Sequence, residues 1–154
     1  MPEMIADNLK SVTERMAKCC GNSGRPEGCV QLVAVTKEAS VGRMEEALRA
    51  GARDFGENRV QDALVKYRAI GDEASWHLIG HLQTNKVKVA VKIFSLIHSV
   101  DSLKLAQAKG KEIKGSGDAP DVKKLLAFQK DPTVVARVVE VLTHAQFPEL
   151  AKEI

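Results

Sequence analysis

The sequence predicts an α/β protein with a parallel sheet, and two observations support this prediction. Continuous apolar runs alternate with segments of helical periodicity, as where the strand-like run 29–36 is followed by a helix at 41–50. This alternation repeats over residues 29–108. Strands that alternate with helices pair in parallel, because each helix carries the chain back along the sheet. The spacing of the units suits barrel-type winding as well as an open sheet.

Each element can be assigned in order along the chain. Apolar residues at three- and four-residue spacing predict an amphipathic first helix that ends near Gly21. These residues are Ile5, Leu9, Val12, Met16 and Cys19 or Cys20. A loop at 22–28 precedes the first strand, and Gly51 ends the helix that follows it. Further strands are expected at 52–57, 76–80 and 94–100. Further helices are expected at 58–70, at 85–91 and over Leu103 and Leu105, with Asp101 as the cap.

The character of the sequence changes after residue 108, which predicts two parts. Residues 1–108 contain all the strand–helix units, whereas 109–154 begins with a linker rich in lysine and glycine. The remainder is typical of helices, with Asp131-Pro132 as one helix start. We therefore expect about four parallel strands followed by a C-terminal helical tail of unknown role.

Composition and charge exclude several classes of protein. The chain of 154 residues is 44% hydrophobic and 28% charged, which is typical of a globular domain with one core. Its formal charge of +3 is spread along the chain. The densest basic stretch, 86–92, alternates with valine and alanine and has no aromatic neighbour, so we interpret it as the solvated face of a helix. Nucleic-acid binding is therefore not expected.

Membrane insertion is not expected either. No apolar run approaches the roughly 20 residues that a membrane span requires, and the first residues lack a signal-type pattern, so a cytoplasmic location is expected. Cys19, Cys20 and Cys29 are an odd number without spaced partners. They predict reduced thiols, with neither a disulfide framework nor a zinc site.

Lys37 is the first candidate functional residue. It follows the apolar run 33–36 at the carboxyl end of the first predicted strand, which is where parallel-sheet proteins place their chemistry. A neutral lysine amine condenses with an aldehyde to form a Schiff base. The alternative is that Lys37 only begins the next helix or lies in solvent.

Three further motifs resemble one family. They are LVAVTK at 32–37, FGENRVQ at 55–61 and WHLIGHLQTNK at 76–86. In this order and spacing they are similar to the pyridoxal phosphate homeostasis proteins, whose single domain resembles the barrel of bacterial alanine racemase. The segment 98–102 also fits that family's fourth strand and the helix start that follows.

The resemblance implies a fold, a cofactor and a role. The implied fold is a partial TIM-type (β/α) barrel, and Lys37 would hold pyridoxal 5'-phosphate (PLP) as a Schiff base at its mouth. The role is intracellular PLP homeostasis, a carrier or regulator and not a catalyst, with PLP-dependent apoenzymes as partners. Racemase-like catalysis is the weaker enzyme alternative, because its second proton-transfer group is commonly a tyrosine from another domain. Tyr67 lies within a predicted helix, where packing is the expected role.

Other residues in these motifs each allow a functional and a structural interpretation. Asn58 follows a strand, so it either borders the cofactor or caps the next helix. His77 alternates with Trp76 and Leu78 along a strand, so it either contacts the cofactor from inside the barrel or is a hydrogen-bonded core residue. His81 and Gln83 follow the same strand and either border the site or shape the turn.

The sequence also departs from the family. A complete barrel takes about 250 residues and eight strands, and the match ends after the fourth. The family's late Met-Ser and Arg-Ile-Gly segments, which grip the cofactor's phosphate, are not found in 109–154. The exposed sheet edges would need a cover, either the tail helices or a second copy in a homodimer. The alternative function is accordingly a remnant that binds no cofactor and acts as a scaffold or interaction module.

Overall fold

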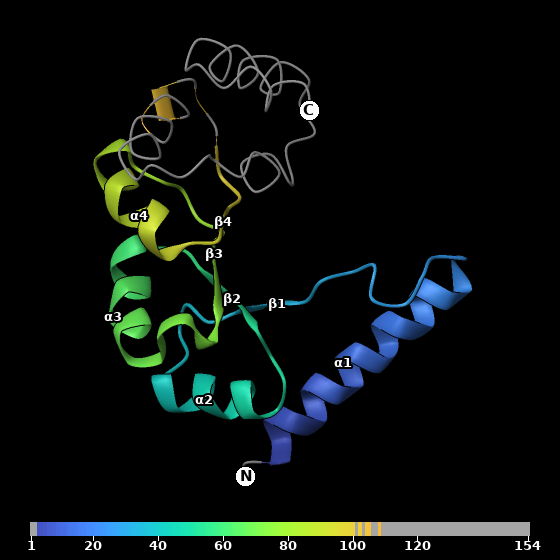
Figure 1. The fold of residues 1–154 in the computed structure, drawn as a ribbon. Coiled ribbons are helices and arrows are strands. Elements are labelled where there is room, and N and C mark those ends of the chain that lie inside the picture. The colour runs from blue at the N-terminus through green and yellow to red at the C-terminus, as the bar shows by residue number, and fades with distance from the viewer. Residues whose placement is uncertain (1–2, 101, 103, 106–107, 109–154) are drawn as a thin grey trace.

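The computed structural model describes residues 3–100, 102, 104, 105 and 108 (Figure 1). The helices are α1 (Glu3–Asn22), α2 (Val41–Arg49), α3 (Val60–Ile70) and α4 (Val87–Ile93). Single 3-10 turns, η1 (Gly71–Glu73) and η2 (Thr84–Lys86), precede β3 and α4. The strands are β1 (Val33–Val35), β2 (Asp54–Glu57), β3 (Ser75–Leu78) and β4 (Leu96–Ile97). The predicted cap Asp101 and the predicted tail 109–154 lie outside the described residues.

The four strands form one parallel sheet whose spatial order follows the chain, β1-β2-β3-β4. An α/β fold with about four parallel strands is thus confirmed. Each strand pairs with the next one along the chain, which is how a (β/α) barrel is wound, whereas doubly wound open sheets reverse their order. The arrangement is therefore that of part of such a barrel.

The two faces of the sheet differ. Helices α2, α3 and α4 lie along one face (Figure 1), and Phe55, Trp76 and Leu78 are fully buried on that side. The rings of Phe55 and Trp76 pack edge to face with centroids 6.2 Å apart. His77 alternates with Trp76 and Leu78, so it points to the opposite face, as its place in the strand predicts.

Local sequence signals explain the helix ends. The Ser40 hydroxyl caps α2 by accepting the Arg43 N–H, and Gly51 has φ 103° just after that helix. In α4, Val87, Ala90 and Ile93 are buried while Lys88 and Lys92 are exposed. The interpretation of the basic stretch as a solvated helix face is confirmed for these lysines.

The strands are shorter than predicted, most clearly at the first one. The apolar run starts at residue 29, but pairing begins only where Val33 meets Asp54. Cys29, Val30 and Gln31 are exposed because no strand lies beside them among the described residues. Apolar character alone therefore overestimates the strand.

No helix of the described part is both long and apolar enough to cross a membrane.

Candidate functional site

The carboxyl ends of β1, β2 and β3 meet at one edge of the sheet. Lys37 lies in the turn just after β1, and its side chain is exposed. Asn58 directly follows β2, and Gly80 lies just beyond β3. Lys37 and Asn58 therefore lie on the same edge, as expected for a parallel sheet.

A buried polar cluster holds the backbone next to Lys37. The Glu57 carboxylate is fully buried, and its Oε1 accepts hydrogen bonds from Thr36 Oγ1 at 2.6 Å and from Lys66 Nζ at 2.8 Å. The same Lys66 ammonium donates to the carbonyl of Thr36 at 2.5 Å. The Lys66 side chain is only 12% exposed. A charge pair removed from water keeps its geometry when both partners are hydrogen-bonded, so the turn that carries Lys37 is anchored from α3.

Sequence reasoning missed this cluster. Lys66 lies on a helix between apolar neighbours and gives no motif of its own. The available signal was Glu57, a carboxylate at the end of a buried strand, because such a group needs a positive partner. The second oxygen of Glu57, Oε2, has no hydrogen-bond partner among the residues described.

A pocket of about 750 Å³ opens beside Asn58, where the start of α3 meets the loop after β3. Its polar lining includes Asn58, Arg59, His81, Gln83 and Lys86. Thus His81 and Gln83, which the sequence placed at the exit of the strand, border the same pocket as Asn58.

Asn58 does not cap α3. The residue at the cap position is Arg59, which makes no side-chain capping bond. Gly80 allows the loop after β3 to approach closely, since a Cβ there would collide with the carbonyl oxygen of Asn58 and lie 2.8 Å from its Cα. Gly80 therefore serves the geometry of the backbone at this edge.

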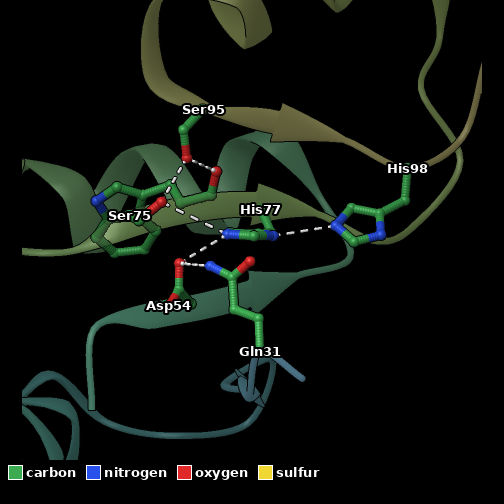
Figure 2. A network of polar contacts seen from close by, with 7 residues as sticks. Gln31, Asp54, Ser75, His77, Ser95 and His98 are labelled. Carbon is green, nitrogen blue, oxygen red and sulfur yellow. Dashed lines mark hydrogen bonds and ion pairs between the residues drawn. The ribbon is translucent and has the colours of Figure 1, made fainter. Parts of the chain in front are cut away.

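His77 belongs to a separate network on the other face of the sheet. Figure 2 shows its ring between Asp54 and His98. His77 Nε2 lies 3.0 Å from Asp54 Oδ1, and Nδ1 lies 3.1 Å from His98 Nε2. The Gln31 amide also donates to Asp54 Oδ1, at 2.8 Å. His77 is 3% exposed, and both its ring nitrogens contact protein atoms. A contact between His77 and a cofactor stays a prediction from the sequence.

The imidazole pair gives this network a pH response. Burial, and secondarily the adjacent His77, lowers the pKa of His98 below its ordinary value of 6.5. Protonating His98 would place a positive charge beside another imidazole in a partly desolvated position. The folded protein therefore favours the neutral form of His98 more than the unfolded chain does.

Racemase-like proton transfer and metal binding find no support at this edge among the described residues. Tyr67, the only tyrosine of the sequence, packs its ring edge-on against Trp76 with centroids 6.0 Å apart and donates its hydroxyl hydrogen to Asp72 at 2.7 Å. It therefore lies on the helix-covered side, in the packing role expected for it. Within the described ranges, no group of three or more His, Cys, Asp or Glu side chains could hold a metal ion.

Comparison with known proteins gives a consistent set of relatives, although no model of a protein family matches the chain. The pyridoxal phosphate homeostasis protein of Aquifex aeolicus is 43% identical over 101 residues, covering 65% of this chain and 44% of that protein. Its namesake in Pseudomonas aeruginosa is 41% identical over 104 residues, covering 67% and 45%. The chain thus spans about half the length of the curated relatives it matches.

Solved structures agree. PipY of Synechococcus elongatus with PLP bound superposes with a TM-score of 0.63 at 30% identity, covering 97% of this chain and 82% of that one. Sequence identity and three-dimensional fold therefore both relate this chain to PipY.

Proposed function

Because the chain belongs to the family of pyridoxal phosphate homeostasis proteins, we propose that it binds PLP and takes part in intracellular, cytoplasmic PLP homeostasis. The observation that carries this proposal is Lys37, an exposed amine at the carboxyl edge of a parallel sheet, on a turn anchored by the buried Thr36–Glu57–Lys66 cluster.

The residues present fit the aldehyde end of this cofactor. When bound, PLP supplies an aldehyde that reacts reversibly with primary amines. Lys37 offers such an amine at an accessible position, and Asn58 offers an amide beside the same edge. The cluster under Thr36 limits how far the Lys37 backbone moves, which supports a defined site in place of random lysine chemistry.

A carrier role is favoured over catalysis. A carrier must bind a reactive aldehyde and release it, which needs an accessible lysine and no acid–base pair around a substrate carbon. The exposure of Lys37 suits transfer to PLP-dependent apoenzymes, the partners we propose. The only tyrosine of the chain, Tyr67, packs against Trp76 and donates a hydrogen bond to Asp72. It therefore supports no racemase-like proton transfer at Lys37.

The test is a visible absorption spectrum of the purified chain during titration with PLP, followed by borohydride reduction and peptide mapping. We expect one stoichiometric label on Lys37. The variant Lys37→Arg keeps the charge but not the nucleophilic amine, so labelling should fall by at least about tenfold. Lys88→Arg, an exposed lysine on α4, is the matched control and should label normally.

Asn58→Ala should weaken PLP binding by roughly five- to tenfold, the value of about one hydrogen bond, while leaving the label on Lys37.

Label scattered over many lysines, or equal affinity for pyridoxal and PLP, would contradict the carrier proposal. That result would favour the alternative of a scaffold or interaction module, for which the exposed Val35 on β1 is the supporting observation.

A further inference from the structure

A pair of cysteines, Cys20 and Cys29, faces each other where α1 ends. Figure 1 shows α1 projecting beyond the sheet, with the chain then turning back toward β1. Cys20 lies in the last turn of α1 and is buried, whereas Cys29 lies on the returning segment and is exposed. Their Sγ atoms are 3.4 Å apart. Two thiols from opposite sides of a turn are therefore already in contact.

The backbone of this turn maintains the contact. The Arg25 N–H donates to the Cys20 carbonyl at 2.9 Å, and the Cys29 N–H donates to the Pro26 carbonyl at 3.3 Å. Gly24 and Gly28 take positive φ values of 67° and 79°. The chain reversal is built from these local bonds, so the turn that brings the two sulfur atoms into contact is formed before they close to the bonding separation of about 2.05 Å.

We propose that Cys20 and Cys29 are a redox modification site, at which a hydroperoxide converts the two thiols into a reversible intramolecular disulfide. This inference is independent of PLP binding. It rests on the facing sulfur atoms, on their unequal exposure and on the pre-formed turn that joins them.

The two cysteines have different roles in the reaction. The Cys29 thiolate attacks a peroxide oxygen, so that an S–O bond forms, the O–O bond breaks and hydroxide leaves. Cys20 then attacks the Cys29 sulfur; the S–S bond forms, the S–O bond breaks, and the second hydroxide departs with the Cys20 proton as water. Two thiols lose two electrons in total, and one molecule of hydrogen peroxide is reduced to two of water.

The surroundings of Cys20 support this order. The hydrogen bond with Cys29, followed by burial, raises the pKa of the Cys20 thiol above its ordinary value of 9.0. Cys20 is therefore the less reactive thiol toward an oxidant in solution, and Cys29 is the accessible one. The neighbouring Cys19 is exposed but has no sulfur contact with Cys29 within the described structure.

The disulfide would affect a segment that reaches the sheet. Two residues beyond Cys29, the Gln31 amide donates to Asp54, which contacts His77 (Figure 2). A bond between α1 and Cys29 would restrict the segment that carries Gln31. The oxidation state of the pair would thereby affect the polar network on the face of the sheet opposite α2, α3 and α4.

The test uses the full chain at low concentration, reduced and then treated with hydrogen peroxide. The free thiols are counted after denaturation, and the peptides are mapped. We expect the thiol count to fall from three to one, with a Cys20–Cys29 cross-linked peptide that dithiothreitol cleaves. Cys29→Ser, a change at an exposed position, should abolish the cross-link.

The matched control is Cys19→Ser, which changes the adjacent exposed thiol and should still form the Cys20–Cys29 bond. Three thiols remaining after treatment would overturn the proposal. A cross-link through Cys19, or one between two chains, would overturn it as well.

Discussion

Two polar clusters on the same small sheet differ in what they hold together and in how they respond to solution conditions. The Thr36–Glu57–Lys66 cluster joins the ends of β1 and β2 to α3 through an ion pair whose carboxylate is fully buried. The His77 network joins β2, β3 and the residue after β4 through imidazoles and one carboxylate. The first cluster positions the turn before Lys37. The second connects strands on the face of the sheet opposite α2, α3 and α4 and favours a neutral His98.

This difference teaches that burial of polar groups serves two purposes here. A buried ion pair with shared hydrogen bonds is costly to break, so it anchors one local backbone geometry. A histidine network is weaker, and here its response to pH comes from His98, whose pKa is lowered by burial and by the adjacent His77. Substitutions in the first cluster should therefore cause large losses of stability, whereas changes in the second should be smaller and pH-dependent.

The largest effect is expected for Lys66→Met. This change keeps the length of the side chain but leaves the buried Glu57 carboxylate without its counter-charge, so the free energy of unfolding should fall by about 3–5 kcal/mol. Urea denaturation of the purified variant measures it. Lys88→Met removes an exposed lysine of α4 and should change stability by less than about 0.5 kcal/mol. Equal effects of the two variants would contradict an anchoring role for Lys66.

A smaller loss is expected for Thr36→Val. The isosteric side chain removes the hydroxyl that donates to Glu57 Oε1, which should cost about 1–2 kcal/mol because the hydrogen bond is buried and its acceptor is charged. Thr36→Ser retains the donor and should recover most of that loss. If valine and serine were equally destabilising in the same denaturation assay, the hydroxyl would not be the stabilising group.

The smallest effect concerns pH and His98. Because the folded pKa of His98 is lowered, the unfolded chain binds more protons once the pH falls below about 6.5. Its contribution to stability is therefore complete above that pH and is lost as the pH falls through the folded pKa. Denaturation curves between pH 8 and pH 5 should show a shallower loss of stability for His98→Asn than for the unmodified chain. An unchanged slope would show that His98 does not carry this response.

Much of the fold could be predicted from local patterns. Gly51 marked the end of α2, and the alternation around His77 identified its face of the sheet. The spacing of apolar residues predicted α1, in which Ile5, Leu9 and Met16 are half-buried, but Val12 of the same set is 37% exposed. Strand ends were less predictable. Pairing stops where the neighbouring strand stops, so the run from Cys29 was too long by several residues.

The sequence by itself determined the α/β class, the family motifs and the position of Lys37 at a strand end, because periodicity and spacing are properties of the chain. Only the tertiary structure decided which polar groups meet. Thr36, Glu57 and Lys66 are separated by up to 30 positions, and Cys20 and Cys29 by nine. Such contacts depend on strand order, helix docking and turn geometry, which bring side chains together in space without any regular spacing along the sequence.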